Sequence, residues 1–298
     1  MDIVDELRAF VATAQTGSFT AAADQLGVSN RLTSKYVAEL EARLGVRLFQ
    51  RTTRRVGLTP AGEDLLARAP ALLDDLDDLL SVVAEGSRGL TGVIRISAPI
   101  TFGEVYVAGM LGRFADLHPG LSIDLRLSDD HVDLASEGID LAFRIGQSDM
   151  ASIKARKLGE YQSVAVASPA YLAAHGTPMA PAALEAHACI LDTNRRAATR
   201  WTFRRDGIDH VVTVQGRFRV NSARASVALA AAGLGIAYAP RFAVTEALET
   251  GALLPVLTDH QGDTGPVSAV YLEGRTMPRK IRALIDFAVE DVRGSAIL

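Results

Sequence analysis

Three short helical patterns separated by glycines occupy the first 45 residues and constrain the fold more than any other feature of the chain. In the first pattern Leu7, Phe10 and Val11 lie on one helical face. Four residues that end or cap helices separate the patterns: Gly17, Ser18, Gly27 and Ser29. The order of two helices, a glycine turn and a further helix predicts a helix-turn-helix unit.

The third helical pattern, which Ser29 is expected to cap, has an unusual distribution of polar residues. Its first turns carry basic and hydrogen-bonding side chains and its acids come later, against the preference set by the helix dipole. The polar face at its start consists of Asn30, Arg31, Thr33, Ser34 and Lys35. A helix whose first turns meet base edges and phosphates has a reason for this reversal, since Asn pairs with adenine and Arg with guanine.

A basic hairpin is predicted directly after this helix. From Val46 to Thr59 the chain reads VRLFQRTTRRVGLT, which alternates like two short strands, with arginines at 47, 51, 54 and 55. Between Ser29 and Thr59 there are seven basic residues and two acidic ones, a local charge of +5 in a chain whose net charge is -4. We interpret the hairpin as a wing that lies on the phosphate backbone of DNA. The alternative is a small helical subdomain whose basic face is merely solvated.

A long helix is predicted to start at Thr59-Pro60, an N-cap followed by proline at the first helical position. Apolar residues then follow at coiled-coil spacing: Leu65, Ala69, Leu72, Leu76, Leu79 and Val83. Pro70 should bend or interrupt this helix. The apolar seam favours dimerisation, and the alternative is an amphipathic helix that packs on its own chain.

Strands and helices alternate from residue 91 to the end of the chain, which predicts an α/β domain with parallel sheets and helices on their faces. The expected strands are 93–96, 121–127, 139–145, 164–166, 218–220, 235–239 and 267–272. The expected helices include a short one between residues 134 and 138, one over 223–232 and one over 278–292. A hairpin is expected around Asp206-Gly207.

The amino-terminal segment resembles the winged helix-turn-helix of the LysR-type transcriptional regulators. The matching residues include Phe10, Gly17, Ser18, Phe19, Ala22, Ala23, Leu26, Ser34, Leu40, Glu41, Gly45, Leu48, Phe49, Leu58 and Gly62. The chain departs from the family where Asn30-Arg31-Leu32-Thr33 replaces the usual Gln-Pro-Ala-Val run. The resemblance implies DNA contacts from Ser29, Asn30, Arg31, Thr33, Ser34, Lys35, Arg51, Thr52, Arg54 and Arg55.

The resemblance covers essentially the whole chain and implies its domain organisation. It implies a winged helix-turn-helix at 1–59, a linker and dimerisation helix at 60–88, and a two-lobed α/β effector-binding domain at 91–298. The first lobe would comprise 91–162 with 267–298, and the second 163–266. The dimer contacts would come from Leu65, Leu72, Leu76, Leu79 and Val83.

Candidate effector-binding residues follow from the rule that ligands of open α/β sheets bind beyond the carboxyl ends of the strands. By that rule they are Pro99, Ile100, Thr101, Ser128, Asp129, Gly146, Gln147, Asn194, Asn221 and Ala239. The alternative for each is an ordinary loop or capping residue. Arg144 could act as counter-ion for a carboxylate or form an ion pair within the domain.

The sequence carries no motif of an enzyme, a metal site or a cofactor site. No two of the six histidines have zinc-ligand spacing, and neither a G-x-S-x-G elbow nor a phosphate loop occurs. Cys189 is the single cysteine, which we expect to be a buried strand thiol. The first ten residues do not read as a signal peptide, and no apolar run reaches the roughly 20 residues of a membrane span, so we expect a cytoplasmic protein.

We therefore expect a LysR-type regulator, a homodimer, homotetramer or larger, which binds double-stranded operator DNA under control of a small-molecule effector. RNA polymerase is a further expected partner, and neither catalytic residues nor a cofactor are expected. The rival interpretation is a cytoplasmic small-molecule-binding protein whose amino-terminal module serves only for dimerisation. An enzyme built on the two-lobed domain is the third.

Overall fold

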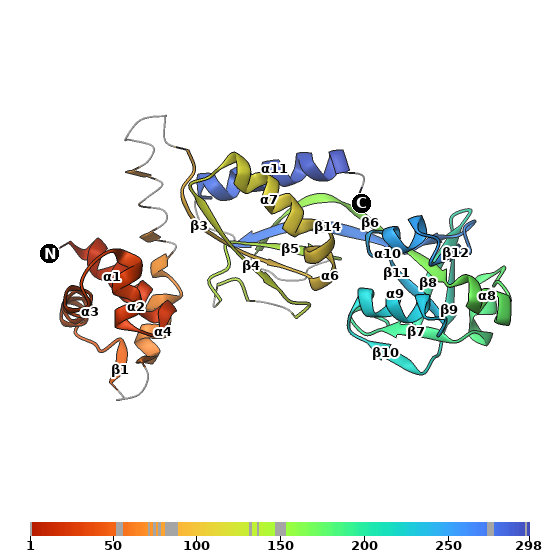
Figure 1. Ribbon diagram of the computed structural model, residues 1–298, viewed down its shortest axis with the longest axis horizontal. Helices are drawn as coiled ribbons and strands as arrows, with labels where there is room; N and C mark the ends of the chain where they lie inside the picture. The colour runs from red at the N-terminus through yellow and green to blue at the C-terminus, as the bar shows by residue number, and fades with distance from the viewer. Residues whose placement is uncertain are drawn as a thin grey trace. The chain divides into compact units, whose positions relative to one another are not determined.

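The computed structural model describes residues 2–51, 56–70, 72–73, 76, 79–80, 89–130, 133–135, 137–146, 153–272, 277–295 and 297–298. The chain forms two compact units, which are described separately (Figure 1). The N-terminal unit comprises residues 1–92, 133–139 and 276–279, and the C-terminal unit comprises residues 93–132, 140–275 and 280–298.

The N-terminal unit contains the predicted helices and hairpin. They are α1 (Ile3–Thr16), α2 (Phe19–Leu26), α3 (Asn30–Leu44), β1 (Phe49–Arg51), β2 (Val56–Leu58) and α4 (Pro60–Leu66). The hydroxyls of Ser18, Ser29 and Thr59 cap three of the helices by accepting backbone N–H groups at 3.4, 3.2 and 3.1 Å. Gly27 has φ 66°, a left-handed conformation that ends α2 and turns the chain towards α3.

An aromatic cluster joins the helices of this unit to the hairpin. The Phe49 ring lies 5.4 Å from Phe10 of α1 and 5.7 Å from Phe19 at the start of α2, centroid to centroid. Leu40 of α3 is buried in the same core. Because β1 contributes Phe49 to this core, the hairpin is anchored to the helices at its base.

The segment after Thr59 does not form one uninterrupted helix. Helix α4 ends at Leu66, residues 67–68 form a turn, and helical structure resumes at Ala69, next to Pro70. Proline lacks the N–H that a continuous helix needs, so the predicted interruption is confirmed.

The apolar residues of this segment divide between the core and the surface. Ala69 and Leu73 are buried in the core of the unit and Leu65 packs partly buried against it, whereas Leu72 and Leu79 are each 60% exposed. Leu65 therefore packs against the core of its own domain, and its predicted dimer contact stays a prediction. Leu76 is half-buried, and Val83 lies outside the described residues.

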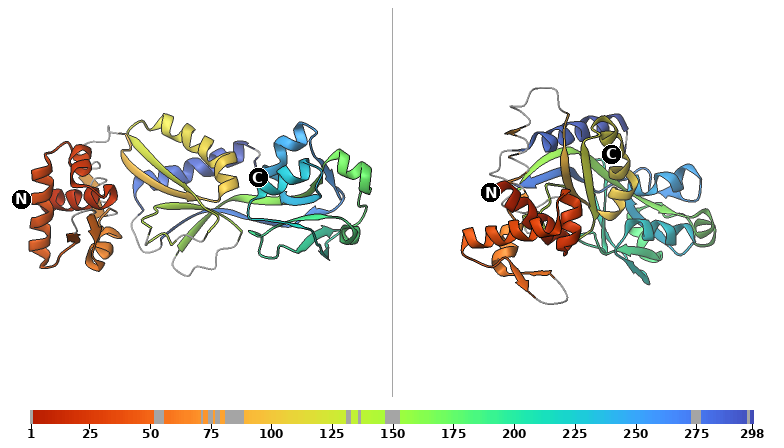
Figure 2. Two further views of the ribbon diagram at one scale, coloured as in Figure 1. Left: turned by 60° about the horizontal axis from the view of Figure 1, so that its bottom comes forward. Right: turned by 60° about the vertical axis from the view of Figure 1, so that its left-hand side comes forward.

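The main sheet of the C-terminal unit runs through both of its halves. The strands lie in the order β10-β7-β11-β6-β14-β5-β3-β4, and β12 also pairs with β6. Their bounds are β3 (Gly92–Ala98), β4 (Leu121–Leu127), β5 (Leu141–Ile145), β6 (Ile153–Ala167), β7 (Cys189–Asp192), β10 (Phe218–Val220), β11 (Ile236–Pro240), β12 (Leu254–Val256) and β14 (Thr264–Leu272). Figure 2 shows β6 and β14 extending from one half of the unit into the other.

The pairing in this sheet is mixed rather than purely parallel. Strand β5 runs parallel to β3, and β7 runs parallel to β10 and β11, as predicted. The long strands β6 and β14 are antiparallel to each other and to their other neighbours, because each carries the chain across between the two halves. Strand β6 pairs with β14 up to Gln162 and with β11 from Ser163 onward.

Helices cover the sheet in both halves. They are α6 (Ile100–Phe102), the π-helix η1 (Gly103–Val107), α7 (Ala108–Leu117), α8 (Pro169–His175), the 3-10 helix η2 (Pro181–Ala186), α9 (Ala223–Ala231), α10 (Arg241–Glu249) and α11 (Arg279–Ser295). A small sheet of β13 (Gln261–Gly262), β8 (Arg200–Arg205) and β9 (Ile208–Thr213) contains the predicted hairpin at Asp206-Gly207. The prediction of a short helix between residues 134 and 138 is wrong, because the described residues there form turns.

The carboxy-terminal helix is fixed on the first half of the unit by a polar cluster. Asp291 of α11 accepts hydrogen bonds from the Tyr106 hydroxyl at 2.6 Å and from two nitrogens of Arg113 at 2.9 and 2.6 Å. The rings of Phe114 and Phe287 pack 5.4 Å apart beside it. None of the described helices is long and apolar enough to cross a membrane.

Candidate DNA interface and effector site

The start of α3 exposes most of the side chains predicted to read DNA. Asn30, Arg31, Ser34 and Lys35 are exposed. Thr33 is an exception, since its side chain is 0% exposed and its hydroxyl donates to the Ser29 carbonyl at 3.3 Å. The prediction that Thr33 contacts DNA is therefore wrong, because that residue faces the core of the domain.

The exposed residues of α3 differ in the hydrogen bonds and ion pairs that they form with neighbouring residues. The Asn30 side-chain amide donates to the Thr20 hydroxyl of α2 at 3.0 Å, and its oxygen accepts from Ser34 at 3.4 Å. Among the described residues, Lys35 forms a single, long ion pair, with Glu39 at 3.9 Å. Arg31 forms no ion pair with any residue that the structure describes. Arg31 is thus available to a ligand without loss of an ion pair to a described residue, and Lys35 would give up only a long one.

Among the described basic residues between Ser29 and Thr59, Arg43 and Arg47 form close ion pairs within the unit, in addition to the long pair of Lys35. Both carboxylate oxygens of Glu6 accept from Arg43 at 3.0 Å, and the Glu6 side chain is 1% exposed. Arg47 donates to Glu41 at 2.9 Å. The positive charge that can meet phosphates therefore comes from fewer residues than the local net charge suggests.

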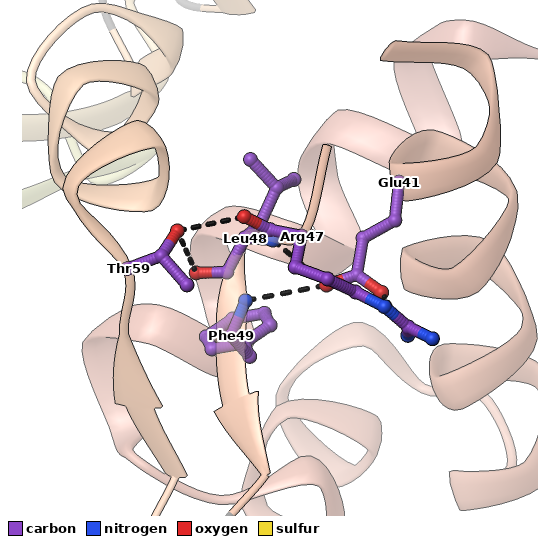
Figure 3. A network of polar contacts seen from close by, with 5 residues as sticks. All are labelled: Glu41, Arg47, Leu48, Phe49 and Thr59. Atoms are coloured by element: carbon purple, nitrogen blue, oxygen red, sulfur yellow. Dashed lines mark hydrogen bonds and ion pairs between the residues drawn. The ribbon is translucent and has the colours of Figure 1, made fainter. Parts of the chain in front are cut away.

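Glu41 organises the root of the wing (Figure 3). One of its oxygens accepts the backbone N–H groups of Leu48 at 2.8 Å and Phe49 at 3.2 Å, where β1 begins. Across the hairpin, the Thr59 hydroxyl donates to the Arg47 carbonyl at 2.7 Å. Burial by itself would raise the pKa of Glu41, but the two backbone N–H groups and Arg47 together hold that pKa below its ordinary value.

The predicted wing is an antiparallel hairpin whose strands are in register from Phe49 opposite Leu58 to Arg51 opposite Val56. Arg51 is the last residue of β1. Thr52, Arg54 and Arg55 lie outside the described residues, so their predicted contacts with the DNA backbone stay predictions.

The structure places the candidate effector residues at the carboxyl ends of strands, as expected. Pro99, Ile100 and Thr101 follow β3, Ser128 and Asp129 follow β4, and Gly146 follows β5; Asn194 follows β7 and Asn221 follows β10. Gln147 lies outside the described residues. Ala239 is 0% exposed inside β11, paired with Val164, so it is a core residue and the prediction for it is wrong.

Four of these residues are joined by hydrogen bonds. Asp129 accepts the backbone N–H of Ile100 at 3.0 Å and the side-chain amide of Asn194 at 2.9 Å. The same amide nitrogen of Asn194 donates to the Asn221 carbonyl at 2.6 Å. The strand-end rule therefore selected residues that are adjacent in space although 29 and 65 positions separate Asp129 from its two partners.

A neighbouring polar cluster was missed from the sequence. Arg195 pairs with Asp263 at 2.6 Å, donates to the Ser163 hydroxyl at 3.2 Å, and lies with its guanidinium 4.4 Å from the Tyr238 ring centroid. Its position beside Asn194 was the only signal in the sequence, because its partners come from three distant segments. Arg144, the candidate counter-ion predicted from the sequence, donates to Ser97 at 3.4 Å.

The structure gives Cys189 a structural environment rather than a reactive one. The thiol is buried in β7, as predicted, and burial raises its pKa to about 12. A thiolate is the reactive form, so this cysteine is a poor nucleophile at neutral pH. Among the described residues, no group of three or more His, Cys, Asp or Glu is arranged to hold a metal ion.

Comparison with known families agrees with this arrangement over nearly the whole chain. Residues 4–63 match the bacterial regulatory helix-turn-helix proteins of the lysR family, and residues 87–293 match the LysR substrate binding domain. The chain belongs to the LysR family of transcriptional regulators. This LysR-type regulator thus combines a helix-turn-helix DNA-binding region with a two-lobed α/β effector-binding domain, and the predicted fold class is confirmed.

The relatives of this regulator match nearly its whole length. It is 36% identical over 283 residues to the transcriptional regulator PtxR of Pseudomonas aeruginosa. The match covers 95% of this chain and 91% of PtxR. It shares 30% identity with the solved structure of CrgA, a LysR-type regulator from Neisseria meningitidis, with a TM-score of 0.63 and coverage of 96% and 98%. The full-length Vibrio cholerae virulence activator AphB is 29% identical, with a TM-score of 0.61 and coverage of 97% and 99%.

Proposed function

We propose that this regulator reads operator DNA with the exposed start of α3 and holds the DNA backbone with its wing. The base-reading residues would be Asn30, Arg31, Ser34 and Lys35, following the Ser29 cap, and the backbone contacts would come from Arg51, Thr52, Arg54 and Arg55. The observation that carries this proposal is the exposed Arg31 at the tip of α3, which forms no ion pair with a described residue. A guanidinium in that position can donate two hydrogen bonds to guanine.

The same proposal includes two copies of the chain on one operator. The exposed side chains of Leu72 and Leu79 lie in the last part of the N-terminal unit, after α4, and burying them against a second copy would remove apolar surface from water. Two recognition helices could then reach half-sites about one DNA turn apart. The organisation 1–59, 60–88 and 91–298, with lobes 91–162 plus 267–298 and 163–266, is part of this proposal.

In our proposal the strand ends of the C-terminal unit bind a small molecule, and the protein acts by regulation rather than by catalysis. Polar groups from both halves of the unit meet at those ends, where Asp129 accepts from the Ile100 backbone N–H and from the Asn194 amide. The relatives in the comparison are transcriptional regulators. RNA polymerase would be the partner through which binding of the operator changes transcription.

The test is a mobility-shift titration on the chain's own upstream DNA together with selection from a randomised duplex pool. Arg31→Ala should change the preferred base at one half-site position, whereas Arg54→Ala should weaken all sequences alike. Lys157→Ala, an exposed lysine of the C-terminal unit, serves as the control for loss of a positive charge. The logarithm of the affinity should fall with log salt by about 0.9 per phosphate contacted. Absence of a sequence-specific complex at every salt concentration would favour a small-molecule-binding protein that merely dimerises.

A further inference from the structure

The Asp129 carboxylate connects two segments that lie on opposite sides of the β6–β14 crossover. On one side, Oδ1 accepts the backbone N–H of Ile100, the first residue after β3 and Pro99, at 3.0 Å. On the other side, Oδ2 accepts the side-chain amide of Asn194, which follows β7, at 2.9 Å. The two halves of the C-terminal unit therefore each provide one donor to a single carboxylate.

The Asn194 amide has no hydrogen left for another acceptor. Its nitrogen donates to Asp129 and also to the Asn221 carbonyl at 2.6 Å, and an amide NH₂ carries two hydrogens. The backbone N–H of Asn194 donates to Asp192 at 3.0 Å, which keeps this residue in place. Asn194 is thus oriented by three contacts, of which only the one to Asp129 crosses to the other half.

A second carboxyl group, that of Asp192, contacts Asn194 through its backbone N–H. Asp192 is 6% exposed, and burial raises its pKa; the Asn194 N–H and Arg195 act in the opposite direction, and the charge of Asp129 raises the pKa further. An additional anion at this point would find both donors occupied and would face the charge of Asp129 at short range. The arrangement therefore works against anions although its donors are of the type that bind them.

We propose that Asp129 is an internal ligand, which fills a carboxylate-binding position formed by the Ile100 N–H and the Asn194 amide, and that it makes the effector site select against anions. This inference rests on the proposed effector-binding function of the same strand ends and names the ligand class. The effector group received beside Asp129 would be neutral or cationic. Asp129 is then the specificity-determining residue for the charge of the effector.

The two halves of the unit have other contacts that remain when Asp129 is changed. The rings of Phe102 and Phe242 pack 5.2 Å apart, and both side chains are buried. Glu104 and Arg224 form an ion pair at 3.1 Å, with both side chains exposed, so its contribution is small. Because the apolar contact persists, removal of the Asp129 carboxylate should leave two oriented donors facing a space the size of a small carboxylate.

The experiment uses the full-length chain and sodium formate as probe, with chloride replacing formate at constant ionic strength. In Asp129→Ala, formate should raise the unfolding temperature of the C-terminal unit progressively with concentration, as a ligand that binds only the folded state does. The wild-type protein should not respond. In Asp129→Ala combined with Asn194→Ala the response should disappear, because one of the two donors is gone.

Two results would overturn the inference: a response of the wild-type protein equal to that of Asp129→Ala, or no response of Asp129→Ala. If Asp129→Ala does not fold, Asp129→Ser supplies the same comparison, with formate binding followed by the carbon resonance of labelled formate. Mobility shifts on the same wild-type preparation separate this inference from the proposed function. If the wild-type protein does not bind DNA, the proposed function alone is contradicted. If the wild-type protein binds DNA but formate does not raise the unfolding temperature of Asp129→Ala, this inference alone is contradicted.

Discussion

Replacing Glu41 by alanine should destabilise the N-terminal unit more than any substitution of an exposed charge in α3. The substitution removes the acceptor of two backbone N–H groups, those of Leu48 and Phe49, which are both buried. Leaving one buried N–H unsatisfied costs about 1–3 kcal/mol, so the two together cost about 2–6 kcal/mol. Water that enters beside Arg47, which is 64% exposed, would lower the figure to about 2–4 kcal/mol.

The appropriate measurement is hydrogen exchange of the Leu48 and Phe49 amides in the full-length protein, followed by mass spectrometry. In Glu41→Ala the free energy of opening at these amides should fall by about 2–4 kcal/mol, and the wing should lose protection with them. Arg47→Ala is the matched control, because it removes the exposed half of the ion pair and should cost less than about 1 kcal/mol. Equal losses in the two variants, or a loss below about 1 kcal/mol in Glu41→Ala, would refute the reasoning.

The same contact sets the sign of a pH effect. The pKa of Glu41 is lowered in the folded protein relative to the ordinary glutamate value of 4.5, so the unfolded chain binds the proton more readily. The stabilisation by Glu41 is therefore complete above pH 4.5 and is lost as the pH falls through the lower folded value. Glu41→Ala should show a smaller loss of stability on acidification than the wild-type protein does.

Three further predictions concern Leu73, Leu72 and Cys189. Leu73→Ala should lower the free energy of unfolding of the N-terminal unit by about 2–4 kcal/mol in calorimetry, because the side chain is buried. Leu72→Ala should instead weaken self-association in sedimentation experiments, and unchanged sedimentation would argue against a dimer contact there. Cys189 should resist alkylation at pH 8 in the native protein and react after denaturation, since its thiol pKa is about 12. Rapid native alkylation would show that β7 opens readily.

Local features of the N-terminal unit were predictable because their hydrogen bonds join residues close in sequence. Ser18 and Ser29 cap helices through N–H groups three residues on, and Gly27 adopts the left-handed conformation that a glycine allows at low cost. Thr33 was wrongly predicted to contact DNA because it is polar, although its spacing places it on the buried face of α3. It precedes Val37 by four residues and Leu40 by seven, which is the spacing of the buried face.

The sequence by itself determined the order of elements in the N-terminal unit, their caps and the family, since these depend on periodicity and on contacts within a few residues. Only the tertiary structure decided which charges remain available: Arg43 is neutralised by Glu6 from another helix, and Arg195 by Asp263 from 68 positions further on. It also decided that Asp129 meets Asn194 and that Leu65 turns inward while Leu72 does not. Such partners are set by how distant segments pack, and helical or strand periodicity carries no information about which distant side chain will face a given one.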